Sequence, residues 1–254
     1  MSATGKKPLE PGAVDVGGAP EGHDARLLAE LIARADGPAI HIARDDRRMA
    51  AMADALAVFA PVLPVLRFPA WDCLPFDRVS PNAEVAAERM ATLAFLAQGF
   101  DRPAAVLTTV NAAVQRVPAR ETLREASFTA EVGRPIDLDA LLGYLARMGF
   151  NRTPTVAEPG DFAVRGGIVD VFPPGAASPV RLDLFGDMLD GARRFEADSQ
   201  RTVERIDRAE FAPASEVILD DAAVTRFRTR YRELFGSAGL DDPLYEAVSA
   251  GRKH

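Results

Sequence analysis

Apolar positions in the first half of the chain follow two different spacings. Three segments carry them at the three- to four-residue spacing of amphipathic helices, namely His23–Ala35, Arg47–Ala60 and the segment that Asn82 can cap and that runs to about Ala97. Shorter β-rich runs lie between these helices, namely Pro38–Ala43, Val62–Phe68 and Ala104–Thr109, and a short helix is expected at Val110–Val117. This alternation predicts a parallel sheet covered by helices.

The pattern changes near Pro118. We expect a strand at Leu123–Val132, a helix at Leu138–Met148, and then a series of short strands with turn signals from Arg152 to Phe211. This order of elements is typical of an antiparallel α+β unit and does not continue the first sheet.

Helices return after Pro213, and they are expected at Asp220–Phe235 and Pro243–Ala250. The first of them has four apolar residues that we place on its inward face, namely Val224, Phe227, Tyr231 and Leu234. Because the chain stops after these helices without another strand, we interpret it as a piece of a longer protein.

These patterns divide the chain into four parts. Residues 1–22 form a polar tail, residues 23–118 an α/β domain, residues 119–212 an α+β domain, and residues 213–254 the helical start of a truncated third segment. The expected fold class is therefore α/β, with a parallel α/β domain followed by a smaller α+β domain and trailing helices.

The composition narrows the classes of function. The chain has 254 residues and a net charge of −7, and it contains one Cys and three His. An acidic surface argues against a broad phosphate-binding field for nucleic acid. A single Cys excludes an intrachain disulfide and fits a reducing cytoplasm, and the scattered His residues make no zinc site. No run of 18 apolar residues occurs, so we expect no membrane partner.

The candidate phosphate-binding loop is Gly17–Asp24, just before the first expected helix. A P-loop follows the pattern G-x-x-x-x-G-K-[ST], in which amides cradle the phosphates, the Lys reaches the outer phosphates and the hydroxyl binds Mg²⁺. Here His23 and Asp24 stand where Lys and Ser or Thr are needed, and Pro20 removes one amide. We interpret this stretch as a degenerate P-loop and a flexible lead-in to a helix, and we expect no ATP binding and no cofactor.

Catalytic motifs are equally scarce. The chain has no G-x-S-x-G, no H-E-x-x-H and no Cys with an evident His partner. His41 lies in an apolar strand, and we interpret it as a packed core residue rather than a ligand. We therefore expect no catalytic residue and no metal site, and we predict that this chain is not an enzyme.

The densest motif lies in the middle of the second unit. Alternation in Gly167–Phe172 and Val180–Phe185 predicts paired strands. Arg165 stands just before a Gly-Gly turn, and Arg181 opens the strand that ends four residues later at Phe185. Residues four apart in a strand share a face, so Arg181 and Phe185 are expected on the same side of the sheet.

Two interpretations of this motif remain open from the pattern alone. Arg165, Arg181 and Phe185 have the composition of a protein-binding hot spot. Alternatively, Phe185 lies in the core, and both arginines pair with a nearby carboxylate of Asp183 or Asp187.

Longer stretches resemble known repair proteins. GDFAVRGGIVDVFP and VRLDLFGD resemble the second domain of two related families, UvrB and the transcription-repair coupling factor Mfd. FPAWDCLPFDRVSPNAEVAAERMATL (Phe68–Leu93) and DSQRT (Asp198–Thr202) resemble the coupling-factor version. UvrB-type chains carry an intact P-loop and a long Tyr-rich hairpin, whereas here the P-loop is degenerate and Trp71–Pro81 is short and poor in Tyr. These departures favour the amino-terminal, UvrB-like module of a coupling factor.

The resemblance, which covers nearly the whole chain, implies a non-catalytic docking module. Its second domain is expected to bind UvrA through Arg165, Arg181 and Phe185, on a face similar to one that the carboxy-terminal domain masks in full-length members. Full-length members are ATP-dependent DNA translocases that also bind RNA polymerase and double-stranded DNA, and they recruit nucleotide excision repair to stalled polymerase. The rival hypotheses are a UvrB-like ATP-dependent DNA-damage-recognition protein and a small α/β enzyme.

Overall fold

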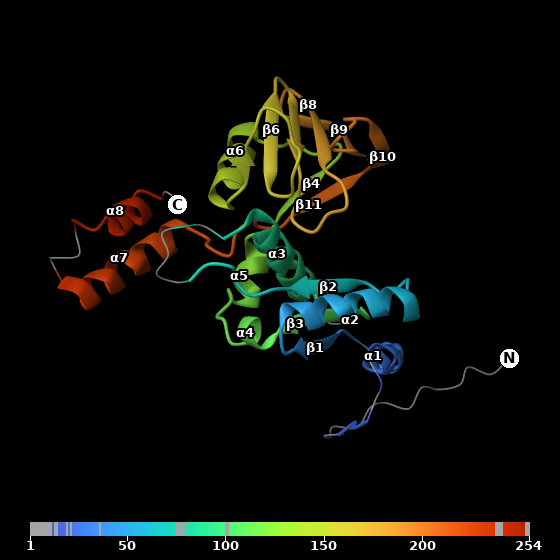
Figure 1. Cartoon of the computed structure of the whole chain (residues 1–254). Coiled ribbons are helices and arrows are strands. Elements are labelled where there is room, and N and C mark those ends of the chain that lie inside the picture. Colours follow the sequence, from blue (N-terminus) through green and yellow to red (C-terminus); the bar gives the residue numbers. More distant parts are fainter. Residues whose placement is uncertain are drawn as a thin grey trace.

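The computed structural model describes residues 12, 15–18, 20, 22–35, 37–74, 79, 81–99, 102–236 and 241–251. A parallel sheet of three strands and a larger, mainly antiparallel sheet of six strands form two separate units, and the last helices lie to one side of both (Figure 1). The expected α/β class, with a parallel unit followed by an α+β unit, is confirmed. Among the described helices, none has the length and apolar character needed to cross a membrane.

The first sheet has the strand order β1-β3-β2, with all neighbours parallel. Its strands are β1 (Ala39–Ala43), β2 (Val65–Phe68) and β3 (Ala105–Thr109). β3 is buried along its whole length because it lies in the centre and both of its faces are covered.

Helices cover this sheet on both faces. α1 (His23–Arg34) and α2 (Asp46–Phe59) pack on one face against the side chains of Ala105 and Leu107. α3 (Ala83–Gln98) and α5 (Arg120–Glu125) pack on the other face, and α4 (Val110–Ala113) follows β3 directly. The side chain of Asn82 accepts a hydrogen bond from the Glu84 amide at 2.8 Å, as expected for the cap of α3.

The second unit is built around a sheet with the strand order β10-β9-β8-β7-β6-β5. All of its pairs are antiparallel except β5 with β6. Its strands are β5 (Asn151–Arg152), β6 (Asp161–Arg165), β7 (Ile168–Val171), β8 (Val180–Phe185), β9 (Met188–Phe195) and β10 (Thr202–Ile206). A separate antiparallel pair joins β4 (Phe128–Glu131) to β11 (Arg208–Phe211).

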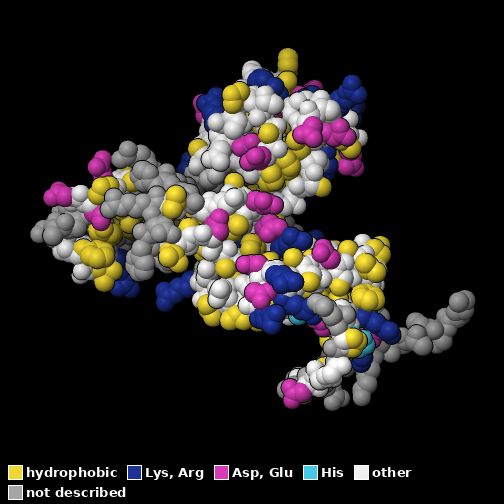
Figure 2. Space-filling model, in the orientation of Figure 1, with side chains coloured by type: hydrophobic (Ala, Val, Ile, Leu, Met, Phe, Trp, Pro, Cys, Tyr) yellow, Lys and Arg dark blue, Asp and Glu magenta, His cyan; other side chains and the backbone are white. Residues whose placement is uncertain are grey.

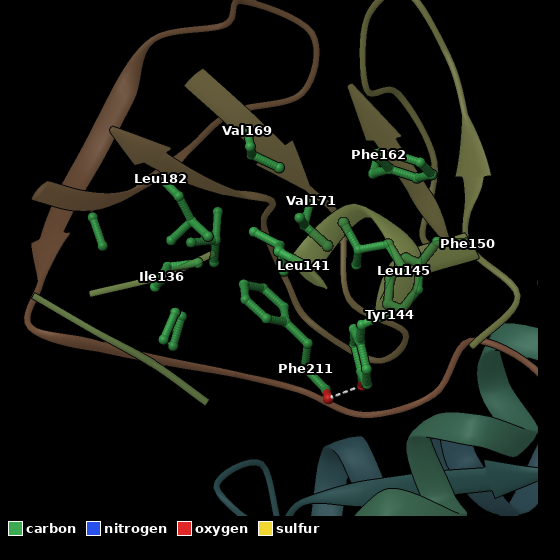
Figure 3. Packing of buried hydrophobic residues seen from close by; sticks show 14 of the residues in the cluster. Ile136, Leu141, Tyr144, Leu145, Phe150, Phe162, Val169, Val171, Leu182 and Phe211 are labelled. Carbon is green, nitrogen blue, oxygen red and sulfur yellow. Dashed lines mark hydrogen bonds between the residues drawn. The ribbon is translucent and has the colours of Figure 1, made fainter. Parts of the chain in front are cut away.

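One helix, α6 (Leu138–Arg147), covers the inner face of the six-stranded sheet (Figure 3). Leu141 and Leu145 of this helix belong to one hydrophobic cluster with Val169 and Leu182 of the strands. The Tyr144 hydroxyl donates a hydrogen bond to the Phe211 carbonyl at 2.6 Å. This core therefore fixes which face of the sheet remains for other contacts.

Two expectations about local structure were wrong. The segment expected as a strand at Leu123–Val132 begins as helix α5, and β4 starts only at Phe128. The helix forms because its charged residues surround a single buried side chain, Leu123, which packs against α3. In α7 (Asp221–Phe235) the side chain of Leu234 is 75% exposed rather than inward, because among the described elements the helix packs mainly on α8 (Pro243–Ser249).

Three further expectations had partial or untestable outcomes. His41 is only half-buried, and its neighbours in β1, Ile40 and Ile42, are exposed, so this strand is less enclosed than a core strand. Most of the polar tail at 1–22 and residues 75–78 and 80 of the loop Trp71–Pro81 lie outside the described residues.

Candidate functional site

The outer face of the six-stranded sheet, opposite α6, carries the residues singled out by the sequence. Leu182 and Leu184 of β8 pack into the core on the inner face. Strand alternation therefore places Arg181, Asp183 and Phe185 on the outer face, as expected for Arg181 and Phe185.

Arg165 and Arg181 meet at a carboxylate that the sequence interpretation did not consider. Asp170 of β7 pairs in register with Arg181 of β8. Arg165 Nη2 lies 2.5 Å from Asp170 Oδ2, and Arg181 donates through Nε to Oδ1 at 2.6 Å and through Nη2 to Oδ2 at 2.8 Å. The Asp170 side chain is 1% exposed, so both guanidinium groups compensate a buried charge.

Arg181 is held from two further sides. Its Nη2 also donates to Gln200 Oε1 at 3.1 Å, and its guanidinium carbon lies 4.4 Å from the centre of the Phe195 ring. The hydrogen bonds to Asp170 raise the pKa of the Arg181 guanidinium, although burial acts in the opposite direction. Arg181 is thus a fixed cation with only 14% of its side chain exposed, whereas the side chain of Arg165 is 46% exposed.

Phe185 lies at the tip of the β8–β9 hairpin and is 83% exposed. Gly186 makes the turn that follows with φ of 63°, a left-handed conformation that suits glycine. The β6–β7 hairpin lies alongside the β8–β9 hairpin, and the Leu184 amide donates a hydrogen bond to the Gly167 carbonyl at 2.7 Å. The tips of the β6–β7 and β8–β9 hairpins lie at the end of the second unit that is far from the three-stranded sheet (Figure 1). Basic and hydrophobic side chains adjoin one another at this end of the molecule (Figure 2).

A second ion pair extends this face. Arg193 of β9 is in register with Arg181 and donates two hydrogen bonds to Asp183, at 2.5 and 3.2 Å. Arg165, Arg181 and Arg193 are balanced by only two carboxylates, so this group carries one net positive charge on a chain whose net charge is −7. A locally positive surface with an exposed aromatic group fits an acidic protein partner.

The geometry of the motif differs from the alternative interpretation in two respects. Phe185 is not in the core, and the arginines Arg165 and Arg181 pair with Asp170, not with Asp183 or Asp187 as in the alternative interpretation. Arg181 is more enclosed than an exposed contact residue, because strand register sets it directly opposite the buried Asp170. The signal that could have revealed Asp170 is a lone carboxylate between Val169 and Val171, inside an otherwise apolar strand.

The degenerate P-loop candidate, Gly17–Asp24, ends in the first turn of α1. Gly22 has φ of 84° immediately before the helix. Asp24 accepts a hydrogen bond from the Ala25 amide at 3.0 Å and forms an ion pair with Arg48 at 2.5 Å. Ala19 and Glu21 of this stretch lie outside the described residues.

A groove of about 970 Å³ lies where the two units meet the segment 214–219 and α8. Its lining is largely apolar and includes Trp71 and Leu74. Two of its polar side chains, Gln115 and Glu216, accept hydrogen bonds from the buried Arg89. These two groups have a structural task, and in the described residues no set of three or more His, Cys, Asp or Glu side chains is arranged to hold a metal ion.

Comparison with known proteins gives a consistent result over most of the chain. Residues 128–217 match the UvrB interaction domain family. The chain is 33% identical to the transcription-repair-coupling factor of Escherichia coli (strain K12), over 89% of this chain and 20% of that protein. It is 38% identical to the one of Myxococcus xanthus, over 85% of this chain and 18% of that protein.

The chain therefore spans about a fifth of the length of these relatives. Another of them, from Haemophilus influenzae, is 30% identical over 91% of this chain. The matched range, residues 128–217, contains all of the outer-face residues described above, from Arg165 to Gln200. Residues 128–217 thus match the UvrB interaction domain, and the chain that carries them is homologous over most of its length to transcription-repair-coupling factors.

Proposed function

We propose that this chain binds UvrA through the outer face of its six-stranded sheet, with Arg165, Arg181 and Phe185 as the central contacts. The observation that carries the proposal is Phe185, which is 83% exposed on the same face of the sheet as Arg181, the arginine that pairs with Asp170. Burying so large an apolar side chain in a partner is favourable, and arginine forks bind carboxylates with defined geometry. The family match at residues 128–217 supports the same assignment.

In this proposal the chain is a docking module without cofactor or catalytic residues. Residues 23–118 act as a UvrB-like α/β domain without a functional P-loop, and residues 119–212 bind UvrA. The parent protein is a transcription-repair coupling factor that works in the cytoplasm and recruits nucleotide excision repair to stalled RNA polymerase. RNA polymerase, double-stranded DNA and the parent's own carboxy-terminal domain are its further partners.

A calorimetric titration of the chain with UvrA tests the proposal. Arg165→Ala, Arg181→Ala and Phe185→Ala are each expected to weaken binding by about 2 kcal/mol, which is roughly thirtyfold. Two matched controls lie elsewhere on the surface, the exposed Phe59 of α2 and the exposed Arg152 of β5. Phe59→Ala and Arg152→Ala are expected to leave the affinity within about twofold, as near-neutral surface changes do.

The outcomes separate the family assignment from the assignment of residues. If the wild-type chain does not bind UvrA, the proposed function is wrong. If it binds but Arg181→Ala and Phe185→Ala bind equally well, the contact surface lies elsewhere on the chain.

The rival function is a UvrB-like ATP-dependent protein that recognises damaged DNA. It requires ATP at Gly17–Asp24, where the Asp24 carboxylate repels phosphate and no Lys is available. A nucleotide titration is expected to give no saturable binding, and duplex DNA is expected to bind weakly and less as salt rises. Micromolar ATP binding that is lost on changing Gly17 or Gly22, or tight salt-resistant binding to damaged DNA, would favour the rival.

A further inference from the structure

Asp170 has an unusual place for a charged residue. It lies in the middle of the sheet, between Ala163 of β6 and Arg181 of β8, and its side chain is 1% exposed. A buried carboxylate is strongly unfavourable unless cations and hydrogen bonds compensate it. Three hydrogen bonds from Arg165 and Arg181 occupy both of its oxygens.

The same three hydrogen bonds fix the two arginines relative to each other. Free arginine side chains have many rotamers, and ordering them on binding costs part of the interaction energy. Here Asp170 Oδ2 accepts from both guanidinium groups, so the two cations lie side by side before any partner arrives. One carboxylate for two cations also leaves one net positive charge.

Gln200 completes this arrangement on the far side of Arg181. Its Oε1 accepts from Arg181, while its Nε2 donates to the carbonyls of Ala197 at 2.7 Å and Val156 at 3.3 Å. Gln200 has φ of 59°, and it is the one non-glycine residue with positive φ in the described part of the chain. A strained backbone held by specific side-chain contacts is a feature of functional sites.

We propose that Asp170 is a positioning residue for UvrA binding, which holds Arg165 and Arg181 as a preformed receptor for one carboxylate of the partner. Asp170 is buried and does not itself contact the partner. Gln200 acts in the same way through Arg181. This inference rests on the proposed function, since it concerns how the same surface binds.

Charge and positioning make opposite predictions for Asp170→Asn. If only the net charge of the surface mattered, removing a carboxylate would make the face more positive and would tighten binding to an acidic partner. If positioning matters, the neutral amide holds the guanidinium groups less firmly, and binding weakens despite the added positive charge. Asn has the shape of Asp, so the sheet loses little packing.

The experiment measures UvrA affinity for wild type, Asp170→Asn and a charge-matched control. Asp190 is an exposed carboxylate on β9 that the Arg165–Asp170–Arg181 cluster does not include. Asp170→Asn is expected to weaken binding about tenfold, whereas Asp190→Asn stays within about twofold. Wild-type-like or tighter binding by Asp170→Asn, with wild-type binding intact, overturns this inference and leaves the proposed function standing. If the wild-type chain does not bind UvrA, both this inference and the proposed function are wrong.

A double-mutant cycle, run with variants shown to be folded, tests whether Asp170 acts through Arg181. If Asp170 acts through Arg181, Asp170→Asn has a smaller effect in an Arg181→Ala background than in the wild type. Equal effects in both backgrounds contradict the inference.

Gln200→Gly provides a variant that does not depend on the stability of Asp170→Asn. Glycine adopts a φ of 59° without strain, which offsets the hydrogen bonds that are lost. We expect Gln200→Gly to weaken UvrA binding by about threefold, in line with one lost hydrogen bond of modest net strength. Unchanged affinity for a folded Gln200→Gly removes Gln200 from the positioning role, and unchanged affinity for both variants overturns the inference entirely.

Discussion

Arg89 and Glu216 form a buried ion pair that joins the first unit to the segment that leaves the second. Arg89 Nε lies 2.6 Å from Glu216 Oε1, and the two side chains are 0% and 7% exposed. The Arg89 guanidinium also donates to the Pro69 carbonyl at 2.7 Å, and its central carbon lies 4.1 Å from the centre of the Phe68 ring and 4.2 Å from that of Trp71. Helix α3 is thereby tied to residues that are more than 120 positions away in the sequence.

Replacing one partner of this pair is expected to be costly. Arg89→Ala leaves Glu216 as an uncompensated buried carboxylate and removes the contacts with both rings, so we expect a loss of about 3–5 kcal/mol in the free energy of unfolding. Urea denaturation monitored by circular dichroism measures it. The control is Arg26→Ala, which breaks an exposed pair with Glu30 and is expected to cost less than about 1 kcal/mol. If the two variants lose the same free energy of unfolding, the buried pair stabilises the fold no more than the exposed pair does.

Two phenylalanines of the second unit are expected to behave differently. Phe172 is buried in a small cluster with Val156, Ala163 and Phe195, whereas Phe185 is 83% exposed. Phe172→Ala is expected to destabilise the second unit by about 3–5 kcal/mol, because it opens a cavity. Phe185→Ala is expected to change stability by less than about 0.5 kcal/mol. Thermal or urea unfolding of both variants measures the difference. A large loss of stability for Phe185→Ala would mean that the Phe185 side chain is buried in solution.

The elements with clear periodicity could be predicted from the sequence, and those set by distant partners could not. The helix that Asn82 caps follows from its apolar positions, yet nothing in that pattern indicates that Arg89 is buried. Its burial depends on Glu216, which only the folded chain brings close. The same holds for the site, where alternation placed Arg181 and Phe185 on one face but not the carboxylate of Asp170 between two arginines. Strand register, which the sequence pattern leaves open, determines that pairing.

We expect His41 to make the stability of the first unit depend on pH. Burial lowers the pKa of its imidazole below the ordinary value of 6.5, and Arg48 lowers it further, while Asp24 acts in the opposite direction. Because the folded-state pKa is below the unfolded one, the contribution of His41 to stability is complete above pH 6.5 and is lost as pH falls through the folded-state pKa. His41→Leu is expected to reduce this loss between pH 7.5 and 5.5.

Urea denaturation at several pH values, followed by the fluorescence of Trp71, the single Trp of the chain, measures this dependence. Trp71 lies in the first unit beside Arg89, so its signal reports on the unit that contains His41. Parallel stability curves for wild type and His41→Leu in this pH range would contradict the prediction.

Gly175 brings the second unit into direct contact with α3 of the first. It lies in the loop between β7 and β8 with φ of 74°, and a Cβ atom there would be 2.3 Å from Ala91 Cβ and 3.0 Å from Ala91 Cα. Gly175→Ala therefore combines backbone strain with a clash against a helix. Gly133→Ala is the matched control, because Gly133 has φ of 80° and open space around its Cβ position.

The control is expected to cost about 1–2 kcal/mol, the usual strain of a left-handed residue. Gly175→Ala is expected to cost about 1–3 kcal/mol more, as overpacking does. Ala91→Gly in the same chain removes the atom that the new methyl group meets, so the double variant is expected to recover part of this extra cost, less the roughly 1 kcal/mol that a glycine costs inside a helix. Urea denaturation of the four chains measures these differences. If Gly175→Ala and Gly133→Ala lose the same stability, the loop moves away from α3 at no cost, and the contact between Gly175 and Ala91 does not hold the two units together.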